Sequence, residues 1–190
     1  MRGLRVDGIY AFASPNPGDG MIGRALSAVP MIRSLRNGRD IVPDLPVDIA
    51  MFGEEYVQPR AFIEINEVPA PNDPLGFFAW HEAALYAAGA IKLQELGAAV
   101  TLAEAARAVV DLYITANSWD WINPVDGTYW ALQIMPNGAR LLIARGTETA
   151  HDWISDFDAT QITTMGARMS VGFWSGVGPI LGELDKAVSA

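Results

Sequence analysis

The chain has 190 residues, of which 51% are hydrophobic and 18% are charged, and its net charge at neutral pH is −9. This length and composition predict one globular domain with a sizeable core and exclude a disordered chain. The acidic excess argues against nucleic-acid binding, which requires clustered Lys and Arg side chains to contact phosphates.

Several kinds of site and anchor are also disfavoured by composition. The sequence has no cysteine and only two histidines, so we expect no disulfide, no cysteine nucleophile and no thiolate or histidine metal site. No motif predicts a bound cofactor, and we expect none. The longest apolar run, Ala83 to Ile91, is much shorter than the ~20 residues of a membrane-spanning helix. The N-terminal residues lack the apolar core of a signal peptide. These features leave the compartment undetermined.

Three strands are predicted in the first third of the chain. Residues 7–14 (DGIYAFAS) form a continuous apolar run closed by the turn sequence PNPGDG. Residues 31–35 form a second run, followed by NGRD and by IVPDLP, whose prolines disfavour a helix or a central strand. Residues 61–68 (AFIEINEV) alternate polar and apolar side chains, as in a half-exposed strand.

Two helices are predicted next. The first begins at Asp73, as N-cap, and ends near Gly97. Helical spacing places Phe77, His81, Leu85 and Ala88 on one face of it. The second covers residues 101–114 and begins with a capping box of Thr101 and Glu104. Its apolar stripe consists of Leu102, Ala105, Ala106, Val109, Val110 and Tyr113.

The remaining elements are a hairpin and a final helix. Residues 128–135 and 139–144 flank a turn at Asn137-Gly138 and predict an antiparallel hairpin, preceded by a Trp-rich loop at residues 119–121. Residues 172–188 predict the final helix. Strands that alternate with helices indicate a layered α/β domain spanning residues 1–190.

Several motifs resemble the class 3 (fungal-lipase-like) lipase family of the α/β-hydrolases. In residues 98–190 these are RGT at 145–147, DWISDFDA at 152–159 and VGF at 171–173, as in the family's N-terminal half. In residues 1–97 they are YAFASPNPGD, NGRDIVPDLP and WHEAALY, as in its C-terminal half. The resemblance implies a single three-layer, circularly permuted domain with a mixed, mostly parallel sheet and flanking helices. It also implies an enzyme that hydrolyses lipid or carboxylic esters.

The permuted order has two consequences. The ancestral termini would be joined near Gly97 to Val100, which is physically tolerable because the termini of compact domains often lie close together at the surface. As a new connection between old termini, this stretch is expected to be exposed and dispensable. The family's nucleophile elbow, G-x-S-x-G, would lie between the two halves but does not occur in the sequence. Ser14, Ser170 and Ser175 lack the elbow pattern, and we expect none of them to be the nucleophile.

The resemblance assigns roles to three residues, each with a plainer alternative. Asp40 would be the triad acid, which orients the imidazole and stabilises imidazolium, or only a turn residue at a strand exit. His81 would be the triad base, or a packed core histidine. Thr147 would donate to the oxyanion that forms during acyl transfer, or simply close a strand end.

A lid would follow Thr147. Its residues would be Asp152, Trp153, Ile154 and Phe157, in a short amphipathic segment whose alternative is a surface turn. His151 and Asp152 are adjacent and lack further ligands, so they do not predict a metal site.

Three readings of the function follow. The first is a lipase- or esterase-like serine hydrolase domain that is nearly inactive alone, because a triad without its nucleophile retains only residual catalysis. It would require a second chain that supplies the elbow strand. The second is a non-catalytic binding or complementation module with the same fold, and the third is a rearranged or incomplete copy of an ordinary lipase. The strands containing Ile9 and Leu142 would flank the missing strand, so they either pair directly or expose edges that favour self-association.

Overall fold

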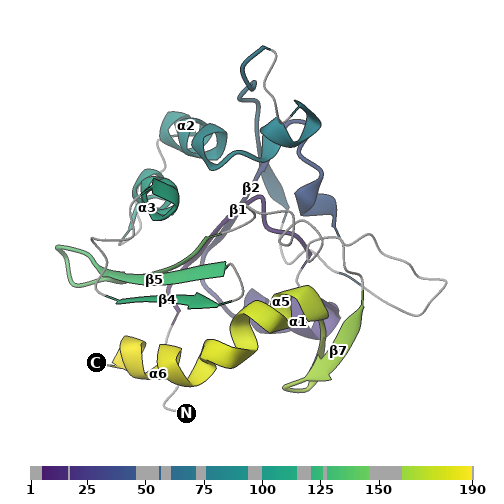
Figure 1. The fold of residues 1–190 in the computed structure, drawn as a ribbon, viewed down its shortest axis with the longest axis vertical. Helices are drawn as coiled ribbons and strands as arrows, with labels where there is room; N and C mark the ends of the chain where they lie inside the picture. The colour runs from purple at the N-terminus through teal and green to yellow at the C-terminus, as the bar shows by residue number, and fades with distance from the viewer. Residues whose placement is uncertain are drawn as a thin grey trace.

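The computed structural model describes residues 6–16, 18–45, 56, 61–71, 76–93, 100–114, 121–125, 128–145 and 160–189. Helices and strands both occur throughout these residues, as expected for the α/β class (Figure 1). Helices α2 (Ala83–Leu93) and α3 (Leu102–Ile114) lie on one side of the strands (Figure 1). Helices α1 (Gly20–Ser27), α5 (Val171–Val177) and α6 (Leu181–Ser189) lie on the other.

The first sheet is parallel and is formed by the first third of the chain. Strands β1 (Ile9–Phe12), β2 (Ile32–Asn37) and β3 (Phe62–Ile65) pair in that order. All three predicted strands are therefore confirmed. The connection between β1 and β2 contains α1 (Gly20–Ser27), a helix that we did not predict, which begins where the Asp19 carboxylate accepts from the N–H of Met21. Because the strands are parallel, the loops after β1, β2 and β3 leave the sheet at the same edge.

Helix α2 (Ala83–Leu93) covers this sheet and follows the 3-10 helix η3 (Gly76–His81). The single predicted helix is thus interrupted at Glu82, which restarts the helical phase. Leu85 and Ala88, which we placed on one face of a continuous helix, are half-buried. The residues that α2 buries are Tyr86, Ala87, Gly89 and Ala90.

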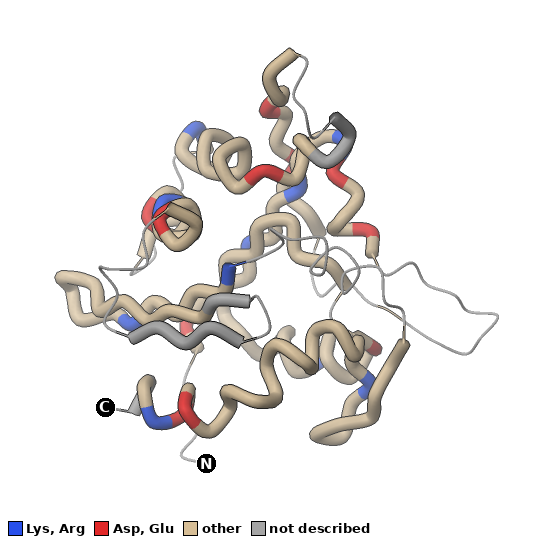
Figure 2. Tube along the Cα trace, in the orientation of Figure 1, with Lys and Arg blue, Asp and Glu red and all other residues tan. Residues whose placement is uncertain are grey.

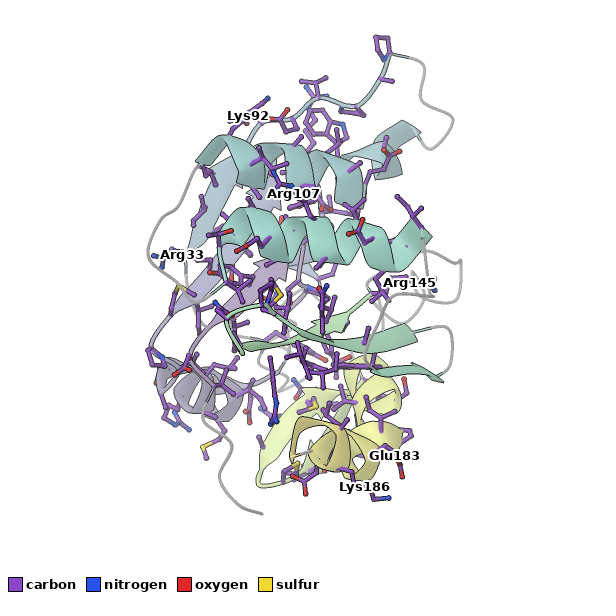
Figure 3. All side chains as sticks on the ribbon, turned by 90° about the vertical axis from the view of Figure 1, so that its left-hand side faces the viewer. Arg33, Lys92, Arg107, Arg145, Glu183 and Lys186 are labelled. Atoms are coloured by element: carbon purple, nitrogen blue, oxygen red, sulfur yellow. The ribbon has the colours of Figure 1, made fainter. Side chains whose placement is uncertain are left out.

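Helix α3 (Leu102–Ile114) lies beside α2 (Figure 3) and begins with the predicted capping box. The Glu104 N–H donates to Thr101 Oγ1 at 3.2 Å, and Glu104 Oε2 accepts from the Thr101 N–H at 2.8 Å. Just before the helix, Val100 is buried and its carbonyl accepts from the Tyr10 hydroxyl at 2.5 Å. We expected residues 97–100, where the two halves join, to be exposed, and this prediction is wrong for Val100. Residues 97–99 lie outside the described part of the chain.

The second sheet is antiparallel, with the order β4-β5-β6. Its strands are β4 (Trp121–Val125), β5 (Thr128–Ile134) and β6 (Arg140–Ala144). The predicted hairpin is confirmed, with Gly138 at a φ of +80° in its turn. Trp121, predicted to lie in a loop, instead begins β4. Helix α3 packs on this sheet through an apolar cluster of Ala108, Leu112, Ala131 and Ile143.

The C-terminal region contains a short hairpin and a broken helix. Strands β7 (Gln161–Thr164) and β8 (Ala167–Ser170) form a two-stranded antiparallel sheet that we did not predict. The single helix predicted over residues 172–188 is divided into α5 (Val171–Val177), the 3-10 helix η4 (Gly178–Ile180) and α6 (Leu181–Ser189). The break falls at Pro179, whose ring nitrogen has no hydrogen to donate to a preceding carbonyl. The Trp130 indole N–H donates to the Gly176 carbonyl at 3.1 Å and joins α5 to β5.

The described strands form three separate sheets instead of one mostly parallel sheet. Only the pairings among β1, β2 and β3 are parallel. Strands β1 and β6 each lie at the end of their own sheet, so the direct pairing that we considered for them does not occur. Helix α3 nevertheless contacts two of these sheets. Leu102 and Ala106 pack on the parallel sheet, and Ala108 and Leu112 pack on the β4-β5-β6 sheet.

Acidic and basic residues are interspersed along the described part of the chain (Figure 2). An example is the Glu183–Lys186 ion pair, one turn apart on α6, with a separation of 2.9 Å (Figure 3). None of the described helices combines the length and the apolar character needed to cross a membrane.

Candidate functional site

The candidate site begins in the turn after β2. Asn37 ends the strand, Gly38 has a φ of +49°, and the Asp40 N–H donates to the Asn37 carbonyl at 2.8 Å. The 3-10 helix η1 (Val42–Asp44) follows, and the Val42 N–H donates to Asp40 Oδ1 at 3.0 Å. Asp40 therefore lies in the turn at the exit of the strand, as in the simpler of the two interpretations of the sequence. It is nevertheless buried, with only 2% of its surface exposed.

His81 lies against this carboxylate. Its Nδ1 is 2.9 Å from Asp40 Oδ2, and the two side chains are 11% and 1% exposed. The structure thus brings together the two residues that the sequence indicated as triad acid and triad base, from positions 41 apart. When a carboxylate accepts from Nδ1–H, the neutral imidazole carries no hydrogen on Nε2, and this is the atom that a general base uses.

Two further residues of the site, Tyr86 and Asn37, were not indicated by the sequence. The Tyr86 hydroxyl, from the first turns of α2, donates to Asp40 Oδ2 at 2.6 Å and accepts from the Asn37 N–H at 2.9 Å. Burial raises the pKa of the Tyr86 hydroxyl far above its ordinary value, and the charge of Asp40 raises it further. Tyr86 follows His81 by five residues in WHEAALY, but a periodic pattern does not distinguish a hydrogen-bonded tyrosine from an ordinary core residue.

The Asn37 side chain connects the site to neighbouring segments. Its Nδ2 donates to the carbonyls of Glu67 at 3.1 Å and Trp80 at 3.2 Å, and its Oδ1 accepts from the Glu67 N–H at 2.9 Å. Asn37 is fully buried, so these bonds satisfy a polar group that would otherwise destabilise the core. Because Trp80 immediately precedes His81, Asn37 also fixes the backbone that carries the imidazole.

The serines considered as nucleophiles occupy different settings. Ser14 follows β1, next to Ala13 at a φ of +52°, and its hydroxyl donates to the Pro15 carbonyl at 3.2 Å. Ser170 is 1% exposed at the start of α5, and the Ser175 hydroxyl donates to the Gly172 carbonyl at 2.7 Å.

The other predicted site residues lie outside the described part of the chain. These are the oxyanion candidate Thr147 and the lid residues Asp152, Trp153, Ile154 and Phe157. The described residues before this segment end at Arg145 (Figure 3), which directly follows β6. Its guanidinium carbon lies 5.6 Å from the centre of the Tyr113 ring on α3.

Among the described residues, no group of three or more His, Asp or Glu side chains is placed to hold a metal ion. No family model, no curated protein and no solved structure matches this chain.

Proposed function

We propose that this chain is a circularly permuted, class 3 lipase-like ester hydrolase domain that holds the acid and the base of a catalytic triad. The observation that carries this proposal is the 2.9 Å contact between Asp40 Oδ2 and His81 Nδ1. The two residues come from the separate motifs NGRDIVPDLP and WHEAALY, each of which resembles a triad region of that family. The parallel strands β1 and β2, with helices on both sides, are compatible with such a domain.

In this proposal each residue has a defined step in acyl transfer. His81 Nε2 removes the proton from a serine hydroxyl as it attacks the ester carbonyl, and later returns it to the leaving alkoxide. The buried Asp40 carboxylate stabilises the imidazolium that forms in between. Thr147 donates to the oxyanion, and the segment containing Trp153 and Phe157 covers the acyl group.

The nucleophile has to come from outside these 190 residues, because the sequence contains no G-x-S-x-G. We place the missing strand, elbow and helix between β1 and β6, which are both end strands of their sheets. Helix α3 packs on both sheets and would hold them on either side of the added strand. The partner in this proposal is a second polypeptide segment, and the substrate is a lipid or carboxylic ester.

Reconstitution tests the proposal. The purified chain is mixed with a synthetic peptide that contains an apolar strand, the sequence GHSxGG and a helix, and it is then exposed to a fluorophosphonate and to p-nitrophenyl esters. We expect no labelling of the chain alone, and labelling and ester hydrolysis when the peptide is present. A peptide with Ala in place of the serine should abolish both.

The variants His81→Asn and Asp40→Asn connect the activity to the site. Each should lower reconstituted hydrolysis by at least about 10³-fold if the pair acts as triad base and acid. Circular dichroism of each variant separates loss of chemistry from loss of fold. Labelling of a serine in the chain itself, or full activity of His81→Asn, would contradict the proposal.

A second candidate function is a non-catalytic complementation module that keeps the fold. The absence of an elbow from the sequence favours it. It predicts that the peptide binds the chain but that the mixture remains inert toward both the fluorophosphonate and the esters.

A further inference from the structure

One oxygen of Asp40 accepts two hydrogen bonds from two different helical segments. Asp40 Oδ2 lies 2.9 Å from His81 Nδ1, at the end of η3, and 2.6 Å from the Tyr86 hydroxyl, on α2. The other oxygen, Oδ1, accepts from the Val42 N–H at 3.0 Å. The two donors at Oδ2 therefore share the negative charge that this atom carries.

The direction of the tyrosine hydrogen bond is determined by its surroundings. A phenol has one hydrogen to donate, and the Tyr86 oxygen already accepts the Asn37 N–H at 2.9 Å. The hydroxyl hydrogen is thus directed at Asp40. Tyr86 is only 1% exposed, and burial together with the charge of Asp40 raises the pKa of its hydroxyl, so the group keeps its hydrogen at neutral pH.

We propose that Tyr86 is a positioning residue for the Asp40–His81 pair. Its hydroxyl holds Oδ2 in place and withdraws part of its charge, which weakens the competing bond from His81 Nδ1–H. The catalytic meaning of this role rests on the proposed function, whereas the hydrogen-bond coupling between Tyr86 and His81 does not. A tyrosine that served only to fill the core would leave the His81 hydrogen bond unchanged when its hydroxyl was removed.

Nuclear magnetic resonance of the imidazole nitrogens measures this coupling directly. A chain labelled with ¹⁵N-histidine carries only two imidazoles, those of His81 and His151, and a His151→Ala variant assigns them. We expect His81 to carry its hydrogen on Nδ1. In Tyr86→Phe, Oδ2 loses its second donor, so the Nδ1–H resonance of His81 should move downfield while the tautomer is preserved.

Tyr10→Phe is the matched control. Tyr10 packs against the apolar cluster that contains Tyr86, Leu35 and Ile65. Its hydroxyl donates to the Val100 carbonyl instead of to Asp40. This variant should leave the His81 resonance unchanged. A folded Tyr86→Phe chain with the wild-type His81 resonance would overturn the proposal.

Tyr86→Phe also removes the oxygen that accepts the buried Asn37 N–H. A second measurement therefore keeps this oxygen and changes only how strongly the hydroxyl donates. Replacing all five tyrosines with 3-fluorotyrosine keeps every hydroxyl and makes each a better donor. The His81 Nδ1–H resonance should then move upfield, opposite to the effect of Tyr86→Phe, and an unmoved resonance would overturn the proposal. Both measurements use the chain without peptide, so their outcome is independent of whether ester hydrolysis can be reconstituted.

Discussion

The Trp80 ring lies against the backbone of Gly38, so the residue before His81 packs on the turn that carries Asp40. Gly38 has a φ of +49°, a backbone conformation that residues with side chains rarely adopt. A Cβ built on Gly38 would lie 2.5 Å from Cζ3 of Trp80. The guanidinium carbon of Arg39 lies 6.0 Å from the centre of the same ring. This contact, together with the hydrogen bonds of the Asn37 side chain, holds the turn that carries Asp40 against the segment that carries His81.

Gly38→Ala should therefore lower the free energy of unfolding for two reasons. We expect about 1 kcal/mol from the backbone conformation and a further ~1–3 kcal/mol from displacement of Trp80. Gly138→Ala is the control, since Gly138 has a φ of +80° but no atom within 4 Å of the added Cβ, and should lose only about 1 kcal/mol. Urea denaturation measures both, and equal losses would mean that the contact with Trp80 contributes nothing.

The residue patterns that predicted the fold correctly are local ones. The apolar runs at β1, β2 and β3, the capping box of Thr101 and Glu104, and the turn at Asn137-Gly138 each depend on neighbouring residues, and each is confirmed. The errors arise where distant parts of the chain decide the outcome. Trp121 begins a strand because β4 pairs with β5. Glu82 separates η3 from α2, although the residues on both sides of it are helical.

The candidate site divides in the same way. The sequence motifs indicated Asp40 and His81, but only the three-dimensional structure places Nδ1 beside Oδ2. Tyr86 and Asn37 were not predicted because their importance lies in single polar atoms within an apolar environment. Periodicity reports which face is buried and carries no information about which buried hydroxyl meets which carboxylate.

Gly89 provides a prediction about the packing of α2. A Cβ on this residue would lie 2.6 Å from Cδ1 and 2.9 Å from Cβ of Ile65 on β3. Gly89→Ala should thus destabilise the protein by roughly 1–3 kcal/mol through overpacking, although alanine favours helices by about 1 kcal/mol over glycine.

Gly182→Ala on α6 is the matched control, because a Cβ there meets no atom within 4 Å. It should stabilise the protein by up to about 1 kcal/mol, and the two variants are compared by thermal and urea denaturation. A Gly89→Ala chain that is also stabilised would show that Ile65 moves aside easily.

The capping box of α3 predicts a pH dependence. The backbone N–H and the hydroxyl of Thr101 both donate to Glu104, and they lower the pKa of this carboxyl from its ordinary value of 4.5. The stability that the ionised carboxylate contributes is present above pH 4.5 and is lost as the pH falls through the lowered value. Since Glu104 is exposed, we expect roughly 0.3–0.5 kcal/mol at neutral pH.

Comparison of the wild type with Glu104→Gln measures this contribution. The wild type should be more stable at pH 7, and the difference should close below pH 4.5. Thr101→Ala removes one of the two donors and should narrow the same pH-dependent difference. A difference that stays constant down to pH 2 would contradict the assignment.

The last prediction concerns β6, the end strand of the antiparallel sheet. Leu142 on this strand is 37% exposed, whereas its cross-strand partner on β5, Leu132, is 3% exposed. An apolar end strand is a template for pairing with another chain. We therefore expect the purified chain to self-associate with increasing concentration in sedimentation experiments. The strand–elbow–helix peptide should compete for the same edge and reduce this association.

Two lysine substitutions distinguish pairing at the edge from contact through the face of the sheet. Leu142→Lys places a charge on the end strand, whereas Ile134→Lys places one on β5, which lies between β4 and β6 and is 53% exposed at this residue. Association through the strand edge predicts that Leu142→Lys shifts the chain toward monomer and that Ile134→Lys does not. Equal effects of both would indicate contact through the face. A wild-type chain that sediments as a monomer and does not bind the peptide would contradict the proposal of an added strand. This result would favour a closed domain in which Asp40 and His81 have no nucleophile to activate.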